Sequence, residues 1–290
     1  MSNSFAERAT VWLQYVVPKQ ALTAVAGALA RRPLGAVTQA AIRRFIARYQ
    51  VDMTEAAQPD PAAYATFNDF FTRALRPSVR PLADADLVCP VDGAISQCGD
   101  LSGERIVQAK GHDYTATALL GGDAALAAAF ADGVFATLYL SPRDYHRIHM
   151  PCDGRLRAMV HVPGALFSVN PATARGVPGL FARNERVVCV FEGQRPDGRR
   201  FPFVLVLVGA TIVGSMATLW HGVVNPPRPG IVRRWTYDDR EIRLARGAEM
   251  GRFLLGSTVI ALFPRATVTL NPAWAAGRAV RMGEAMGSWR

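Results

Sequence analysis

Residues 186–219, RVVCVFEGQRPDGRRFPFVLVLVGATIVGSMATL, carry three runs that are rich in Val, Leu, Ile and Phe. The runs extend from Arg186 to Phe191, from Phe203 to Val208 and from Ile212 to Leu219, with Gly, Pro and Asp between them. Short runs of β-branched and aromatic residues bounded by turn residues predict β-strands. No helical pattern separates the runs, so we expect them to pair as neighbours in an antiparallel sheet.

The same pattern extends toward both ends of the chain. Earlier runs are found at Leu87–Cys89, Arg105–Val107, Val134–Leu140 and Arg155–Val162. A last run, from Leu254 to Phe263, is interrupted by Gly256-Ser257-Thr258. Helices do not alternate with these strands, which argues against a parallel α/β sheet. We therefore predict a mainly antiparallel β core.

The first part of the chain has a different pattern. Residues 36–50 place Ala, Ile and Phe at helical spacing with arginines on the opposite face, and Thr66 to Leu75 reads as a second helix. Thr66 or Asn68 is suited to cap that helix, and Arg76-Pro77 to end it. The expected fold is α+β, with a helical N-terminal part, residues 1–80, packed on a β-rich core, residues 81–290.

Composition limits the partners. Half of the 290 residues are hydrophobic and 19% are charged, which suits a folded domain with a sizeable core. The net charge of +10 calls for an acidic partner, such as nucleic acid or anionic lipid. No helix-turn-helix, zinc-finger or RNA-recognition pattern is present, so we expect no nucleic acid.

The N-terminal segment favours the lipid. An apolar cluster from Val11 to Val17 is interrupted at Pro18, and a second apolar run from Ala21 to Ala30 ends at two arginines. Neither run reaches the ~20 residues of a membrane-spanning helix. Amphipathic helices with Trp and Tyr among aliphatic residues suit the membrane interface. The alternative is that these are ordinary helices packed on the core. Glu7 and Arg8 interrupt any secretory signal.

A metal site is not expected. The four cysteines, at positions 89, 98, 152 and 189, form no C-x-x-C pair, and we expect reduced thiols. His146 and His149 are close in sequence but have no acidic or cysteine partner at standard zinc spacing. A site formed by His146, His149 and Asp153 remains an alternative.

Three segments carry residue types that perform chemistry. Val91-Asp92-Gly93 places an acid at a turn, although Asp-Gly is also an ordinary turn dipeptide. Residues 140–151, LSPRDYHRIHMP, contain His146 and His149, whose imidazoles titrate near neutral pH. Residues 250–258, MGRFLLGST, place Ser257 after a glycine, where a bent backbone brings its hydroxyl near the preceding carbonyl.

These segments belong to a series of blocks that resembles a known family. The blocks are FNDFFTRALRP, PVDGAISQCG, QAKGHDY, YLSPRDYHRIHMPCDG, VPGALFSVN, LFARNERVVCVF, LVGATIVGS and GAEMGRFLLGSTVIALF. In this order, and over almost the whole chain, they resemble bacterial, membrane-associated phosphatidylserine decarboxylases. The extreme N-terminus and the last residues match least.

The resemblance implies a proenzyme that cuts its own backbone between Gly256 and Ser257. Asp92, His149 and Ser257 correspond to the charge relay for this cleavage. A histidine that accepts the hydroxyl proton and a carboxylate that fixes its tautomer would activate the serine. The products would be residues 1–256 (the beta chain) and residues 257–290 (the alpha chain), which stay together as a heterodimer. The sequence leaves open whether two such pairs associate.

The resemblance also implies the reaction. Ser257 would become a covalent pyruvoyl group, the pyruvate cofactor of this lyase, and form a Schiff base with the amine of phosphatidylserine. His146, by its place in the block, would assist decarboxylation or reprotonate the product. The product would be phosphatidylethanolamine, a step of phospholipid biosynthesis. The expected location is the cytoplasmic side of the cell membrane, as a peripheral protein on its anionic surface.

Two other readings remain open. A serine hydrolase could use the same Asp92, His149 and Ser257 on an external ester, although Leu255 and Val259 replace the glycines of a G-x-S-x-G elbow. A basic, non-enzymatic lipid-binding protein is the second alternative.

Overall fold

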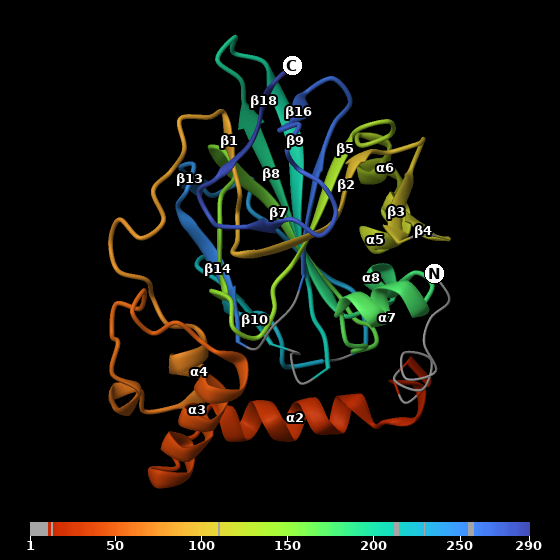
Figure 1. Cartoon of the computed structure of the whole chain (residues 1–290). Helices are drawn as coiled ribbons and strands as arrows, with labels where there is room; N and C mark the ends of the chain where they lie inside the picture. The colour runs from red at the N-terminus through yellow and green to blue at the C-terminus, as the bar shows by residue number, and fades with distance from the viewer. Residues whose placement is uncertain (1–10, 13, 110, 212–214, 229, 255–257) are drawn as a thin grey trace.

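The computed structural model describes residues 11–12, 14–109, 111–211, 215–228, 230–254 and 258–290. The N-terminal helices lie along one end of a large β-sheet, and short helices cover part of one of its faces (Figure 1). The N-terminal elements are α2 (Lys19–Ala30), α3 (Ala36–Tyr49), the 3₁₀ helix η1 (Pro61–Ala63) and α4 (Phe67–Phe71). The helices beside the sheet are α5 (Ala116–Leu119), α6 (Ala124–Ala128), α7 (Pro171–Gly176) and α8 (Leu180–Arg183).

The largest sheet holds nine of the described strands, and its neighbours pair antiparallel. Its order is β12 (Arg233–Thr236), β7 (Gly154–Val162), β8 (Arg186–Gln194), β9 (Arg200–Val208), β15 (Thr258–Phe263), β5 (Val134–Tyr139), β2 (Gly93–Asp100) and β17 (Ala279–Val280). Strand β13 (Arg243–Leu244) also pairs with β7. The antiparallel core and the α+β class are confirmed.

Smaller sheets flank this core. One has the order β11 (Gly222–Val223), β10 (Met216–Thr218), β14 (Glu249–Phe253) and β6 (Arg147–His149). A second contains β1 (Leu87–Val88), β18 (Ala285–Trp289) and β16 (Val268–Leu270). A third is the hairpin β3 (Arg105–Ala109) and β4 (His112–Thr115). In the described part of the chain, no helix is both long and apolar enough to cross a bilayer.

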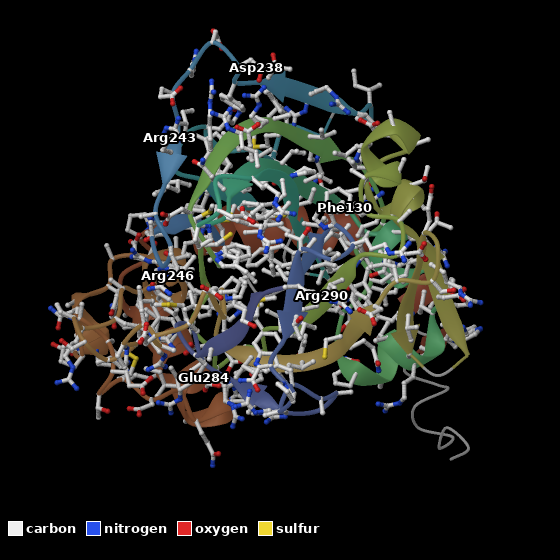
Figure 2. The ribbon with its side chains drawn as sticks, turned by 90° about the horizontal axis from the view of Figure 1, so that it is seen from above. Phe130, Asp238, Arg243, Arg246, Glu284 and Arg290 are labelled. Atoms are coloured by element: carbon white, nitrogen blue, oxygen red, sulfur yellow. The ribbon has the colours of Figure 1, made fainter. Side chains whose placement is uncertain are left out.

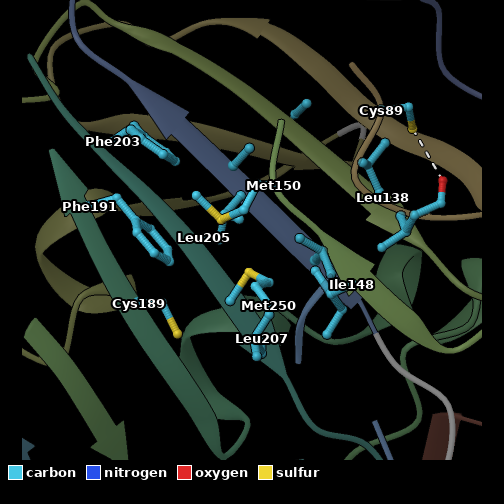
Figure 3. Close-up of a cluster of buried hydrophobic side chains, with 14 of the residues drawn as sticks. Cys89, Leu138, Ile148, Met150, Cys189, Phe191, Phe203, Leu205, Leu207 and Met250 are labelled. Atoms are coloured by element: carbon cyan, nitrogen blue, oxygen red, sulfur yellow. Dashed lines mark hydrogen bonds between the residues drawn. The ribbon is translucent and has the colours of Figure 1, made fainter. Parts of the chain in front are cut away.

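The hydrophobic run of β9 is continuous because both faces of the large sheet are buried. Phe203, Leu205 and Leu207 point into one hydrophobic cluster, whereas Val204 and Val206 point into another. Side chains of a strand alternate between faces, so a strand covered on both sides needs apolar residues at every position. Figure 3 shows the first cluster, where Phe203 lies beside Phe191, Leu205 beside Met150 and Leu207 beside Met250.

The N-terminal helices are confirmed with one difference in length. Helix α3 matches the predicted residues 36–50, and Thr66 caps α4 in a capping box with Asp69. Helix α4 ends at Phe71 rather than at Leu75. The backbone beyond it pairs with residues 56–57 instead, through an Ala56–Leu75 bridge and a bond from the Ala57 N–H to the Ala74 carbonyl. Long-range pairing therefore replaces the last helical turn.

The strand register aligns one end of the large sheet. Across five neighbouring pairs, Val162, Arg186, Val208, Thr258, Tyr139 and Ala94 stand in one row. The chain therefore enters β8 at Arg186 and β15 at Thr258 from the same end of the sheet. Helices α2 and α3 lie at that end in Figure 1.

Gly93 directly precedes Ala94 of this row, where β2 meets β5. A Cβ atom at Gly93 would lie 2.2 Å from the Tyr139 carbonyl oxygen. Gly93→Ala should therefore force the two backbones apart and lower the free energy of unfolding by about 1 to 3 kcal/mol, measured by urea denaturation.

Gly27→Ala in α2 is the matched control. A Cβ atom there meets only Arg31 Nη1, the far end of a long side chain, at 3.3 Å, and alanine favours a helix. A loss at position 93 no larger than the change at position 27 would contradict the tight approach of β2 to β5.

Candidate active site

The sequence-predicted residues gather at the aligned end of the sheet. Asp92 directly precedes β2, and Thr258 starts β15, two strands away. With neighbouring strands about 4.8 Å apart, Ala94 and Thr258 lie about 10 Å from each other across β5. Gly256 and Ser257, the predicted cleavage site, lie outside the described residues.

Strands β6 and β14 bring both histidines beside the segment that leads to the predicted cleavage site. Antiparallel pairing sets His149 opposite Glu249, and the Phe253 N–H donates to the His146 carbonyl at 3.0 Å. His149 therefore lies beside the start of β14, and His146 beside its end. Leu254, the last described residue before the cleavage site, donates its N–H to the Ser215 carbonyl at 3.0 Å.

His149 is held as a neutral base. Its Nδ1 lies 2.7 Å from the Gly247 carbonyl oxygen, which can only accept, so Nδ1 carries the proton. The Tyr145 hydroxyl lies 3.0 Å from Nε2 and donates to its lone pair. Burial lowers the pKa of His149, although the Gly247 carbonyl and the charges of Glu249 and Asp92 oppose it. At neutral pH the ring is therefore able to accept a proton at Nε2.

His146 is fully buried in a different environment. Its Nδ1 donates to the Asp144 carbonyl at 2.7 Å, and its ring lies 4.1 Å from the Phe71 ring, centroid to centroid. Burial lowers the pKa of His146 to about 3, and the positive charge of Arg73 acts in the same direction. Nε2 is buried and has no hydrogen-bond partner among the described residues. His146 is thus a neutral ring with an open acceptor.

Asp92 is bound to an arginine rather than to a histidine. Arg80 reaches both carboxylate oxygens, with Nε 3.0 Å from Oδ1 and Nη2 2.6 Å from Oδ2, and the Met282 N–H donates to Oδ1 at 2.8 Å. Arg80 Nη2 also lies 2.6 Å from Glu55. The structure brings Asp92 and His149 to the same end of the sheet without a hydrogen bond between them.

Sequence reasoning missed Arg80, Tyr145 and Glu249. Glu249 accepts from Arg147 Nη1 at 2.8 Å and forms an ion pair with Arg252 Nη2 at 2.8 Å, and so links β6 to β14 beside His149. Tyr145 lies in the same segment as the two histidines, residues 140–151, but no spacing rule predicts its hydrogen bond to His149. Arg80 reaches Asp92 from an irregular segment, and a local sequence pattern does not predict such a contact.

A second buried polar group lies at the same sheet end, on the other side of β15. The Glu185 carboxylate accepts from His161 Nε2 at 2.9 Å and from Arg228 Nε at 2.8 Å. Burial raises the pKa of Glu185, but these two hydrogen bonds outweigh it and the net pKa is lowered. Its oxygens have partners, so the group serves to fix the chain around β8.

The described residues contain no group of three or more His, Cys, Asp and Glu side chains that could hold a metal ion. The alternative set does not come together as ligands, because Asp153 accepts from the Arg246 N–H while His146 and His149 use Nδ1 on carbonyl oxygens. All four cysteines are free thiols.

A family model described as phosphatidylserine decarboxylase matches residues 67–288, and a second, described as PSD, matches residues 9–50. The chain belongs to the phosphatidylserine decarboxylase family. Relatives named phosphatidylserine decarboxylase proenzyme include proteins of Methylibium petroleiphilum (70% identical), Acidovorax ebreus (69%) and Dechloromonas aromatica (64%). Each alignment covers 97% of this chain and 97 to 98% of the relative.

The Arg80 contact gives a stability prediction for this decarboxylase-family chain. Arg80→Met leaves Asp92 and Glu55 without their shared cation, and the Arg80 and Asp92 side chains are only 6% and 9% exposed. Loss of one partner of a buried pair should lower the free energy of unfolding by about 3 to 5 kcal/mol in urea denaturation.

Arg281→Met serves as the control, because Arg281 contacts Glu55 at 3.3 Å from a side chain that is 63% exposed. That change should cost less than about 1 kcal/mol. Equal losses in the two variants would show that Arg80 has no special role at Asp92.

Proposed function

We propose that this chain cuts itself between Gly256 and Ser257 and then decarboxylates phosphatidylserine to phosphatidylethanolamine and CO2. Family membership over residues 67–288 carries this proposal, together with relatives named as proenzymes that align with almost the whole chain. Two neutral, buried histidines beside β14 support it, because both steps move protons.

In the proposed cleavage, Ser257 Oγ attacks the Gly256 carbonyl carbon while His149 Nε2 takes the hydroxyl proton. The peptide C–N bond breaks, an ester forms, and the proton passes to the Ser257 amine. Removal of the Ser257 α-proton then expels the Gly256 carboxylate and leaves dehydroalanine. Addition of water and loss of ammonia give a pyruvoyl group on the second chain.

In this proposal, the Gly247 carbonyl and Asp92 share the task that one carboxylate performs in a Ser-His-Asp triad. The Gly247 carbonyl fixes the tautomer of His149, a task that a carboxylate performs in many triads. Asp92 contributes its negative charge, which raises the basicity of the ring from a distance. The Tyr145 hydroxyl occupies Nε2, so it must turn aside before that nitrogen accepts the serine proton.

The first described residue after the predicted cleavage site is held in the large sheet. Thr258 is fully buried and is paired on one side with Tyr139 and on the other with Val208. A pyruvoyl group formed at position 257 would therefore be joined to an anchored strand. Once formed, the group would supply a ketone for the substrate amine and a conjugated carbonyl that accepts the electron pair released with CO2. The low pKa of His146 favours a role as an acceptor for the substrate amine at Nε2 rather than as a proton donor.

Ser257→Ala tests the proposal directly. It should give one uncleaved chain on a denaturing gel, with no release of CO2 from phosphatidylserine, because no pyruvoyl group forms. Ser288→Ala, at an exposed position of β18, is the control and should be cleaved as the wild type is. Cleavage at position 257 in Ser257→Ala would refute the mechanism, and a wild-type protein that stays one chain would refute the proposed function.

Variants of the other site residues separate the two steps. His149→Ala and Asp92→Asn should slow self-cleavage, whereas His146→Ala should be cleaved but decarboxylate slowly. Intact mass and the rate of CO2 release measure the two steps independently. Normal cleavage of both the His149 and the Asp92 variant would show that the relay is misassigned, and normal turnover by His146→Ala would remove His146 from the reaction.

The proposed location is the surface of an anionic membrane. Helix α2 exposes Leu22, Val25 and Leu29, at 46%, 59% and 51%, on one face, while Thr23 and Ala30 are buried. Trp12 is 67% exposed just before it. An apolar stripe of this kind, with arginines at the helix end, suits insertion into the headgroup region. Helix α2, which carries this stripe, lies at the sheet end that holds the candidate site (Figure 1).

Replacement of the stripe tests this location. The variant Leu22→Ser, Val25→Ser, Leu29→Ser should sediment with phosphatidylglycerol vesicles at least about tenfold more weakly than the wild type, because apolar area drives insertion. Val107→Ser, which removes an apolar side chain 44% exposed on β3, should bind normally. Unchanged sedimentation of the triple variant would place the membrane contact elsewhere.

A further inference from the structure

Arg73 is a buried cation without a carboxylate partner. The residue is 5% exposed, and its Nη2 donates to the Arg143 carbonyl at 3.1 Å. Its Nε and Nη1 atoms are buried and have no hydrogen-bond partner among the described residues. A buried donor left without a partner costs free energy, more when the group is charged, so such a group in a folded protein requires an explanation.

Another buried arginine shows what a purely structural role looks like. Arg186 is 3% exposed, and its three nitrogens donate to the carbonyls of Leu119, Asn184 and Ala118. The protein therefore satisfies a buried guanidinium with backbone oxygens where it only needs to hold chains together. Arg73 has one such contact and two open donor atoms.

Arg73 lies beside the candidate active site. Arg73 follows α4, whose Phe71 packs on the His146 ring, and its charge lowers the pKa of that histidine. The neighbouring segment contributes further buried polar atoms without partners among the described residues, Ser141 Oγ and His146 Nε2. Arg73 thus lies next to the segment that carries this open acceptor, within electrostatic reach of His146.

Negative charge is near Arg73 but is committed elsewhere. Asp92 is bound by Arg80, and Asp144 accepts from the Ser141 N–H at 2.6 Å. Both attract Arg73 electrostatically without an ion pair. An anionic ligand would therefore supply the partner that the protein does not.

We propose that the Arg73 guanidinium binds the phosphodiester of the lipid headgroup. This inference rests on the proposed function, since phosphatidylserine carries both a phosphate and a carboxylate. Decarboxylation removes negative charge from the carboxylate, so a cation bound there would stabilise the ground state more than the transition state. A cation on the phosphate holds the headgroup without that penalty, and it binds substrate and product alike.

Kinetics of the self-cleaved variants Arg73→Lys and Arg73→Gln test the assignment. With phosphatidylserine in detergent micelles, KM should rise about tenfold or more while kcat changes less, because an interaction present in both ground and transition states is lost. Inhibition by phosphatidylethanolamine, which keeps the phosphate but lacks the carboxylate, should weaken by the same factor. Cleavage into two chains, checked by intact mass, shows that the variants fold.

Arg186→Lys is the matched control and should lower thermal stability while leaving KM unchanged. An unaltered KM in the cleaved Arg73 variants would overturn the proposal. Weaker binding of phosphatidylserine with unaltered inhibition by phosphatidylethanolamine would assign Arg73 to the carboxylate and overturn it as well. A wild-type protein without decarboxylase activity would instead refute the proposed function.

A crystal structure of the self-cleaved wild-type protein with glycerophosphoethanolamine decides the matter if the variants fail to fold. The phosphate should lie within hydrogen-bond distance of Arg73 Nε or Nη1. A phosphate bound elsewhere, with both atoms still unpartnered, would overturn the inference.

Discussion

The arrangement of the candidate site depends on the pairing of β15 between β5 and β9. Six consecutive residues, Thr258 to Phe263, are buried and make ladder contacts with β5 on one side, and five of them also pair with β9 on the other. This double pairing sets the level of Thr258 relative to Tyr139 and Ala94 in β5 and β2. A shift by one residue would turn every side chain of β15 to the opposite face, into a cluster built for a different set of volumes.

Several paired polar groups lie at one end of the core around β15. Charged and titratable side chains at that end are buried or half-buried with specific partners: Arg80 with Asp92 and Glu55, Arg147 and Arg252 with Glu249, and Arg228 and His161 with Glu185. His146 Nε2 and Arg73 Nε and Nη1 differ from these pairs, because they have no hydrogen-bond partner among the described residues. The two histidines differ by three residues in sequence, yet their rings have separate partners because β6 is extended rather than helical.

Patterns within a few residues predicted the central strands and the N-terminal helices, but not the short helices α5 to α8 or short strands such as β6 and β17. The runs at 134–140, 155–162 and 203–208 became β5, β7 and β9, because a doubly covered strand needs unbroken hydrophobicity. Helix α4 was predicted too long, since its last residues pair with Ala56 and Ala57 across a loop. Arg80 at Asp92, Tyr145 at His149 and the open donors of Arg73 are products of long-range packing, which no single-sequence spacing rule reports.

The strand order also determines whether two fragments of the chain would stay associated after the backbone is cut. Residues 257–290 contribute β15 to the middle of the large sheet, β17 to its edge beside β2, and β16 and β18 to the sheet with β1. If the bond before Ser257 is cut, the 34 residues that follow remain paired with strands of the longer fragment. The fragments would then separate only when the large sheet unfolds. The cut would therefore create a new chain end while almost all contacts between the two fragments remain.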